Sequence, residues 1–134
     1  MISPDVERIL STCVATHEAL QTLLLLKRAP GRTWRADELA AALNLERDLA
    51  RRTLQGLASG GLLAMDTVSA PPGYRYAPGT PEATAAADGL ERTWLERPLE
   101  VIAVMNSNAI ARTRTDAIRA FADAFLIPRG RSDD

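Results

Sequence analysis

Residues 47–55 bring together side chains that can bind DNA. Arg47, Arg51 and Arg52 carry guanidinium groups, and Gln55 follows four residues after Arg51. An arginine can form two hydrogen bonds to a guanine or bind a phosphate, and a glutamine amide matches the edge of an adenine. If this stretch is a helix, these side chains fall outside its apolar stripe. These residue types therefore predict a helix surface that can contact the bases and phosphates of double-stranded DNA.

Acidic and apolar neighbours support a different interpretation of the same stretch. Asp48 would repel phosphate, and Leu49 would offer a base only an apolar contact. Arg51 and Arg52 could pair with Glu46 or with Asp48 on a solvated helix. Two hypotheses stay open: a DNA-binding protein, or a protein-interaction module that binds a regulator or a component of the transcription machinery. The first requires guanidinium groups that are exposed and not tucked against neighbouring acids.

A thiol and an imidazole four residues apart raise the possibility of a redox sensor. On one helix, Cys13 and His17 would lie on the same face, and a nearby imidazolium lowers the pKa of a thiol. The same face carries leucines, among which a buried thiol is inert. With one Cys and one His in the chain, we expect no internal disulfide and no four-ligand metal site.

Motifs for catalysis are weak throughout the sequence. Gly60 and Gly61 lack the strand and helix that must flank a phosphate-binding loop, and His17 lies among leucines, which is a poor place for a general base. We therefore expect that the protein is not an enzyme and that it needs no cofactor.

The DNA-contacting residues belong to a stretch, residues 34–63, that reads as two short amphipathic helices. Asn44 tolerates the left-handed backbone of a sharp helix exit, and the glycines at 60 and 61 end the second helix. Strands are predicted at 62–65 and 74–76, with a Pro- and Gly-containing turn between them. Helix, turn, helix and hairpin form a winged helix-turn-helix. The apolar positions that form its seam are Leu39, Ala40, Leu43, Leu45, Ala50, Leu54 and Leu57.

Residues 16–78 resemble bacterial winged helix-turn-helix transcriptional regulators of the broad MarR-like kind. The resemblance rests on Glu38, Leu39, Ala40, Leu43, Leu45, Ala50, Leu54, Leu57, Gly61, Leu62 and Leu63. It implies a DNA-binding fold, with a short strand near Trp34 that pairs with the wing at 62–77. Arg35 and Arg75 could then reach backbone phosphates. Such regulators usually bind as two-fold dimers, which implies a near-palindromic site.

Helical extensions are predicted on both sides of this motif. Ser3 and Thr16 can cap two N-terminal helices, and Thr80 can cap a helix after the linker at 77–81. Pro98 should break that helix, and residues 106–108 should mark another break. The predicted fold is mainly α with a small β-hairpin wing, divided into a winged helix-turn-helix domain with its N-terminal helices (1–79) and a helical extension (80–134).

The C-terminal extension carries more apolar surface than a small core needs, and we predict that it forms a homodimer. The residues expected at the interface are Leu90, Trp94, Leu95, Leu99, Ile102 and Met105. The alternative is that this segment packs back on residues 20–26 of the same chain. A last stripe, which includes Ile118, Phe121 and Phe125, is either core or a ridge that binds a protein partner, and we favour core.

The overall composition is that of a soluble globular protein. The chain has 134 residues, of which 46% are hydrophobic and 25% charged, and a net charge of −1. No apolar run is long enough to span a membrane, and the N-terminus lacks the features of a secretory signal, so we expect a cytoplasmic protein. Since the chain is not basic overall, a DNA-binding surface must be a local cluster.

Overall fold

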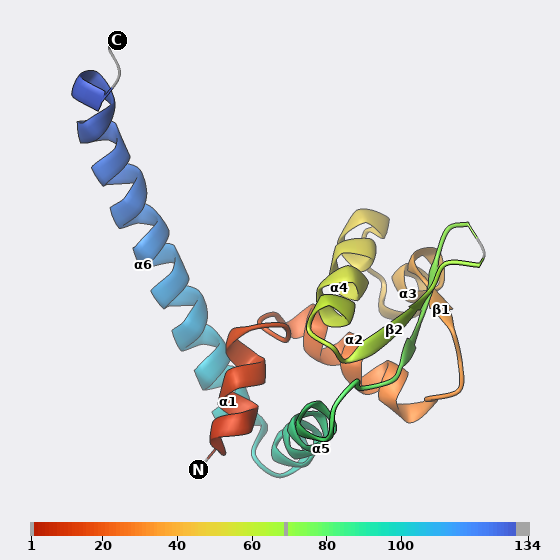
Figure 1. Ribbon diagram of the computed structural model, residues 1–134. Coiled ribbons are helices and arrows are strands. Elements are labelled where there is room, and N and C mark those ends of the chain that lie inside the picture. The colour runs from red at the N-terminus through yellow and green to blue at the C-terminus, as the bar shows by residue number, and fades with distance from the viewer. Residues whose placement is uncertain (1, 69, 131–134) are drawn as a thin grey trace.

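The structure is a computed structural model that describes residues 2–68 and 70–130, with side chains described as far as residue 122. Figure 1 shows a body of short helices and a small sheet, from which one long helix projects. The elements in chain order are α1 (Pro4–Ser11), α2 (His17–Arg28), β1 (Trp34–Arg35), α3 (Ala36–Leu43), α4 (Arg47–Ser59), β2 (Leu63–Asp66), β3 (Gly73–Tyr76), α5 (Pro81–Glu96) and α6 (Pro98–Gly130).

Hydroxyl side chains begin three of the helices, as the sequence predicts. Ser3 accepts a hydrogen bond from the backbone N–H of Val6 at the start of α1, at 3.3 Å. Thr16 caps α2 in the same way at 3.1 Å, and Thr80 caps α5 at 3.0 Å. Each hydroxyl satisfies a backbone N–H that has no partner inside its helix, which fixes where the helix begins.

The predicted helix-turn-helix is formed by α3 and α4. Asn44 ends α3 in the left-handed conformation, with φ of 56°, and Gly61 follows α4 with φ of 83°. Leu39 of α3 packs with Leu54 and Leu57 of α4, and all three side chains are fully buried. The short turn between the helices and this shared apolar seam hold α4 across α3.

A three-stranded antiparallel sheet, in the order β1-β3-β2, completes the winged helix-turn-helix fold. Trp34 of β1 and Met65 of β2 are both opposite Tyr74 of the central strand. Because side chains alternate along a strand, these residues share one face of the sheet, and Arg75 lies on the other. Trp34 and Tyr74 are buried, so that face covers the core. The predicted pairing of a short strand near Trp34 with the wing is confirmed.

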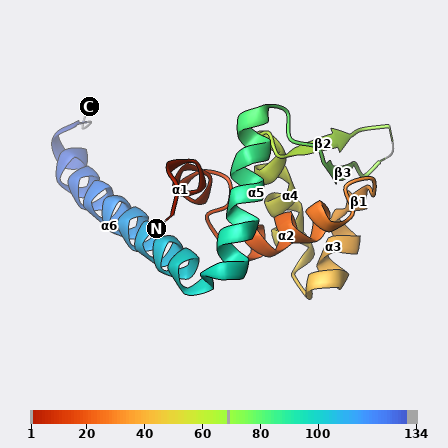
Figure 2. The same ribbon diagram turned by 90° about the horizontal axis from the view of Figure 1, so that it is seen from below.

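Helices from both ends of the chain join the same core. Leu10 of α1, Leu23 of α2, Leu90 of α5 and Val101 of α6 are fully buried in one cluster with the side chains of the helix-turn-helix. Figure 2 shows α5 running across the body beside α2 and the base of α6 beside α1. The core is therefore built from segments on both sides of the linker at 77–81.

The long helix α6 corrects one prediction. Helix α5 does end before Pro98, as expected, but α6, which begins there, continues without a break through residues 106–108 to Gly130. Asn and Ser lower helix stability by only about 0.5 kcal/mol each relative to Ala, and neither removes a backbone hydrogen bond. These residues therefore could not end a helix whose first turns are anchored in the core.

The apolar stripe in the second half of α6 also differs from the expectation that it is core. Ile118 is 63% exposed and Phe121 is 64% exposed. The helix has left the body by this point, so no other described element can cover them. The side chain of Phe125 lies outside the described residues. Among the described helices, none has the length and apolar character needed to cross a membrane.

Candidate nucleic-acid interface

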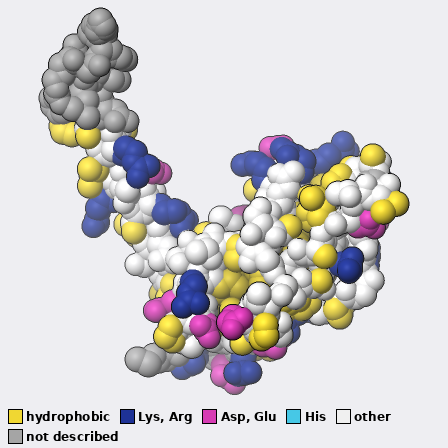
Figure 3. All heavy atoms as spheres, in the orientation of Figure 1, with side chains coloured by type: hydrophobic (Ala, Val, Ile, Leu, Met, Phe, Trp, Pro, Cys, Tyr) yellow, Lys and Arg dark blue, Asp and Glu magenta, His cyan; other side chains and the backbone are white. Residues whose placement is uncertain are grey.

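Helix α4 has one buried side and one exposed side, and the exposed side carries the predicted DNA-binding residues. Its buried positions are Ala50, Leu54 and Leu57, which anchor the helix in the core. Its exposed positions include Arg47, Arg51, Arg52 and Gln55. In Figure 3 the Lys and Arg side chains gather over the N-terminal end of α4, with acidic side chains beside them. No other described element covers this side of α4.

An acidic residue in the first turn of α4 binds two of these arginines. Oδ1 of Asp48 lies 2.6 Å from Nη2 of Arg51, and its Oδ2 lies 3.0 Å from Nε of Arg52. Nη1 of Arg51 also donates to Oε1 of Gln55 at 3.3 Å. The hydrogen bond from Arg51, followed by the charge of both arginines, holds the pKa of Asp48 below its ordinary value. The alternative expected from the sequence, pairing of Arg51 and Arg52 with Asp48, is therefore present, so these two arginines do not meet the condition of standing clear of neighbouring acids.

These ion pairs leave the guanidinium groups accessible. The side chains of Arg51 and Arg52 are 50% and 61% exposed, and that of Asp48 is 53% exposed. Exposed pairs of this kind contribute between 0 and about 1 kcal/mol, because water solvates both partners well. A phosphate or a base can thus compete for the same donors. The Arg47 side chain has no ion-pair or hydrogen-bond partner in the part of the chain that the structure describes.

The wing supplies less positive charge than the helix. Arg75 is exposed on β3, opposite Ala64 of β2. Arg35 is only half-buried, but its Nε atom is buried without a hydrogen-bond partner, so this side chain is partly committed to the body. The loop that joins the two wing strands, residues 67–72, contains no Lys or Arg, and its Val68 is 96% exposed.

An arginine outside the predicted set stands next to the sheet. The guanidinium carbon of Arg32 lies 3.7 Å from the centre of the Trp34 ring, within the range of a cation–π interaction. Trp34 is 4% exposed and fills the core, while Arg32 covers its ring from outside. The spacing of two residues next to a strand, which places both side chains on one face, could have revealed this pair.

The predicted dimerisation residues separate into two groups. Leu90 and Met105 are buried in the core of a single chain, and Trp94 is half-buried with its ring 6.1 Å from that of His17 on α2. Packing within one chain thus explains Leu90 and Met105, and we remove both from the expected interface. The accessible members are Leu95, Leu99 and Ile102, which are 73%, 78% and 37% exposed.

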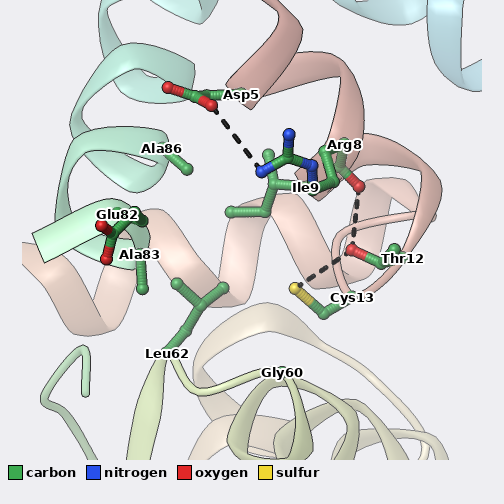
Figure 4. Close-up of a pocket in the computed structure, with 10 residues that line it drawn as sticks. All are labelled: Asp5, Arg8, Ile9, Thr12, Cys13, Gly60, Leu62, Glu82, Ala83 and Ala86. Atoms are coloured by element: carbon green, nitrogen blue, oxygen red, sulfur yellow. Dashed lines mark hydrogen bonds and ion pairs between the residues drawn. The ribbon is translucent and has the colours of Figure 1, made fainter. Parts of the chain in front are cut away.

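The geometry around the lone cysteine does not support a redox sensor. Cys13 lies in the loop between α1 and α2, whereas His17 is the first residue of α2, so the two do not share a helix face. Burial raises the pKa of the Cys13 thiol, the opposite of what a reactive thiol needs. As Figure 4 shows, the thiol lines a small pocket between α1, α5 and the end of α4, with Thr12 as its hydrogen-bond donor at 3.8 Å.

No cluster of three or more His, Cys, Asp or Glu side chains that could hold a metal ion occurs within the described residues.

No protein-family model matches the sequence, and a search of curated proteins gives no significant match. Among solved structures, the chain is similar to the zinc-dependent MarR family transcriptional regulator AdcR in the Zn(II)-bound state. That match has a TM-score of 0.42 and 20% sequence identity, and it covers 80% of this chain and 75% of the other.

Proposed function

We propose that the protein is a cytoplasmic, non-enzymatic regulator of transcription that binds double-stranded DNA as a homodimer. In this proposal α4 enters the major groove, and the wing at 62–77 follows the neighbouring backbone. The winged helix-turn-helix (residues 1–79) binds DNA, and the extension (80–134) joins two copies. The near-palindromic site then follows from the two-fold symmetry of the dimer.

The observation that carries this proposal is the uncovered outer side of α4. A recognition helix must be rigid, must stand clear of the body and must present donors that match base edges and phosphates. Buried leucines hold α4 in place, and Arg47, Arg51, Arg52 and Gln55 are exposed on its other side. The ion pairs of Asp48 do not cover this side, because all three partners stay about half-exposed.

Salt dependence of DNA binding tests the proposal directly. Arg47, Arg51, Arg52 and Arg75 would bring about four positive charges per subunit to the DNA, so the logarithm of the binding constant should fall with that of the salt concentration with a slope near −7 for a dimer. Arg47→Ala should make the slope less steep by about 2. Arg92→Ala, which removes an exposed arginine from α5, is the matched control and should leave the slope unchanged. If fragments of the source genome do not bind even at low salt, the proposal fails.

The projecting part of α6 supports the homodimer. Its first turns use Val101 and Met105 to pack into the body, whereas Leu99 and Ile110 lie on the opposite side and are 78% and 59% exposed. With Ile118 this side forms an apolar stripe along most of the described helix. A second α6 offers the same stripe, so a two-fold axis along the helix would cover both.

Sedimentation tests the dimer independently of DNA. Ile110→Glu combined with Ile118→Glu would place charges in the proposed interface, and we expect a monomer that keeps its helical circular dichroism. Arg119→Glu changes the net charge by the same two units at an exposed position on the other side of α6 and should leave the dimer intact. A wild-type protein that sediments as a monomer at every concentration would remove the model of two half-sites.

A protein-interaction module is the alternative, and one observation favours it. The wing loop carries no Lys or Arg, and its Val68 is almost fully exposed, which suits an apolar partner better than a phosphate backbone. Ile118 and Phe121 on α6 offer further exposed apolar surface for such a partner. In this case genomic DNA would not bind, and Val68→Asp would abolish capture of the partner.

A further inference from the structure

Asp48 presents a conflict within the proposed DNA-binding surface. Its side chain is 53% exposed and lies between two arginines on the outer side of α4. A carboxylate there repels phosphate and neutralises part of the positive charge that attracts DNA of any sequence. On electrostatic grounds alone, Asp48 should therefore weaken binding to every DNA equally.

The same carboxylate also orders the side chains around it. One oxygen binds Nη2 of Arg51 and the other binds Nε of Arg52, while Nη1 of Arg51 continues to Oε1 of Gln55. Four side chains thus form one chain of hydrogen bonds along two turns of the helix. Without it, each exposed arginine would sample many rotamers, and fixing one rotamer on binding would cost side-chain conformational entropy.

The atoms that Asp48 leaves available are suited to base recognition. Arg52 is held through Nε, and neither of its terminal nitrogens has a hydrogen-bond partner within the described part of the chain. These two nitrogens form the fork that binds O6 and N7 of guanine. The amide nitrogen of Gln55 likewise has no described hydrogen-bond partner, while its oxygen is fixed by Arg51. The carboxylate therefore orients donors towards the side of α4 that would face the bases.

We propose that Asp48 is a specificity-determining residue, which orients Arg51, Arg52 and Gln55 for one base sequence and lowers the affinity of α4 for all other DNA. This inference rests on the proposed DNA-binding function. It assigns to Asp48 a positioning role that acts through the arginines. Removal of its charge should then have opposite effects on affinity and on discrimination, which a purely repulsive carboxylate would not produce.

The variant Asp48→Asn tests this role. Duplexes would first be selected by the wild-type protein from a random pool, and the best of them would be compared with a scrambled duplex of the same length and composition. The variant should bind the scrambled duplex more tightly, with a salt slope steeper by about 1 per subunit. The ratio of selected to scrambled affinity should fall at least about fivefold, since a good bidentate contact discriminates by about that factor or more.

The matched control is Asp37→Asn. Asp37 is the second residue of α3, as Asp48 is of α4, and it is also exposed, but its described contact is the backbone N–H of Glu38 at 3.0 Å. The substitution Asp37→Asn removes the same charge from the helix-turn-helix without freeing an arginine. We expect a ratio of selected to scrambled affinity equal to that of the wild type. Thermal unfolding of both variants would establish that they are folded.

A second selection gives a readout that a merely structural role would not change. Sites selected by Asp48→Asn should lose the preference for guanine at one position of each half-site, and Asp48→Glu should restore part of it. An unchanged ratio and unchanged selected sites for Asp48→Asn would overturn the proposal, as would an equal loss of discrimination in Asp37→Asn. If the wild-type protein binds no DNA, the proposed function itself fails, and this outcome is distinct from the others.

Discussion

Two glycines, one inside α4 and one directly after it, should respond in opposite ways to the same substitution. Gly56 lies inside the helix, and a Cβ atom added there would have no heavy atom within 4 Å. Gly60 caps the end of the helix, and a Cβ there would lie 2.5 Å from Cβ of Cys13 and 2.7 Å from its Sγ. We predict that Gly56→Ala stabilises the protein and that Gly60→Ala destabilises it.

The size of each effect follows from the local geometry. Alanine in a helix interior is favoured over glycine by about 0.5 to 1 kcal/mol, which is the expected gain at Gly56. Gly60 has φ of −79° and ψ of 0°, which alanine can adopt, so its cost comes from the contact with Cys13 alone. Because Cβ of Cys13 is fixed to the backbone of its loop, the loop or the helix end must move. Such overpacking costs about 1 to 3 kcal/mol.

Urea unfolding of the two single variants measures both changes, and a double-variant cycle tests the cause. Cys13→Gly removes both atoms that the new methyl group would meet, so in the Gly60→Ala background it should recover most of the loss. The expected coupling energy is at least about 1 kcal/mol. Cys13→Ala keeps the nearer atom and should recover less. If Gly60→Ala is as stable as Gly56→Ala, or if Cys13→Gly restores nothing, the inferred packing of the loop on α4 is incorrect.

Two further predictions concern the attachment of α5. Nζ of Lys27 lies 2.9 Å from Asp88 and 2.7 Å from Glu91, so Lys27→Met should lower the unfolding free energy by about 1 to 2 kcal/mol in urea titrations. The hydrogen bond to Glu91 raises the pKa of Lys27 above its ordinary 10.5. The difference in unfolding free energy between wild type and variant should therefore be constant from pH 7 to about 10 and become smaller at higher pH. A difference that grows above pH 10 would contradict this expectation. Thr80→Ala should cost about 1 kcal/mol by removing the cap on Ala83, whereas Thr80→Ser should cost little.

The elements with local signals could be predicted from the sequence. Ser3, Thr16 and Thr80 begin helices because a hydroxyl at that position satisfies a nearby N–H, and this needs no knowledge of the rest of the chain. Asn44 and Gly61 take positive φ where the chain must turn. The seam of Leu39, Leu54 and Leu57 follows from helical periodicity. These signals together were sufficient to identify the winged helix-turn-helix.

Features that depend on the path of the whole chain could not be predicted in the same way. Helical spacing placed Cys13 and His17 on one face, but α1 ends at Ser11 and the chain turns between them. The periodicity of Ile118 and Phe121 predicts one apolar stripe, yet nothing local shows that α6 leaves the body before reaching it. For Asp48, spacing suggested the pairs with Arg51 and Arg52 but not that one carboxylate would bind both.

The contacts of α5 matter for DNA binding if two copies join through α6. Helix α4 packs on α2, and Lys27 near the end of α2 binds two acids of α5, which leads into α6 through Arg97. The position of each recognition helix relative to the two-fold axis therefore depends on α2 and α5. Half-sites about one helical turn apart require that distance to be kept within a few ångströms. Lys27→Met should then weaken binding to a two-half-site duplex more than to a single half-site, even under conditions in which the variant is fully folded. Equal weakening on both duplexes would show that α5 does not set the spacing.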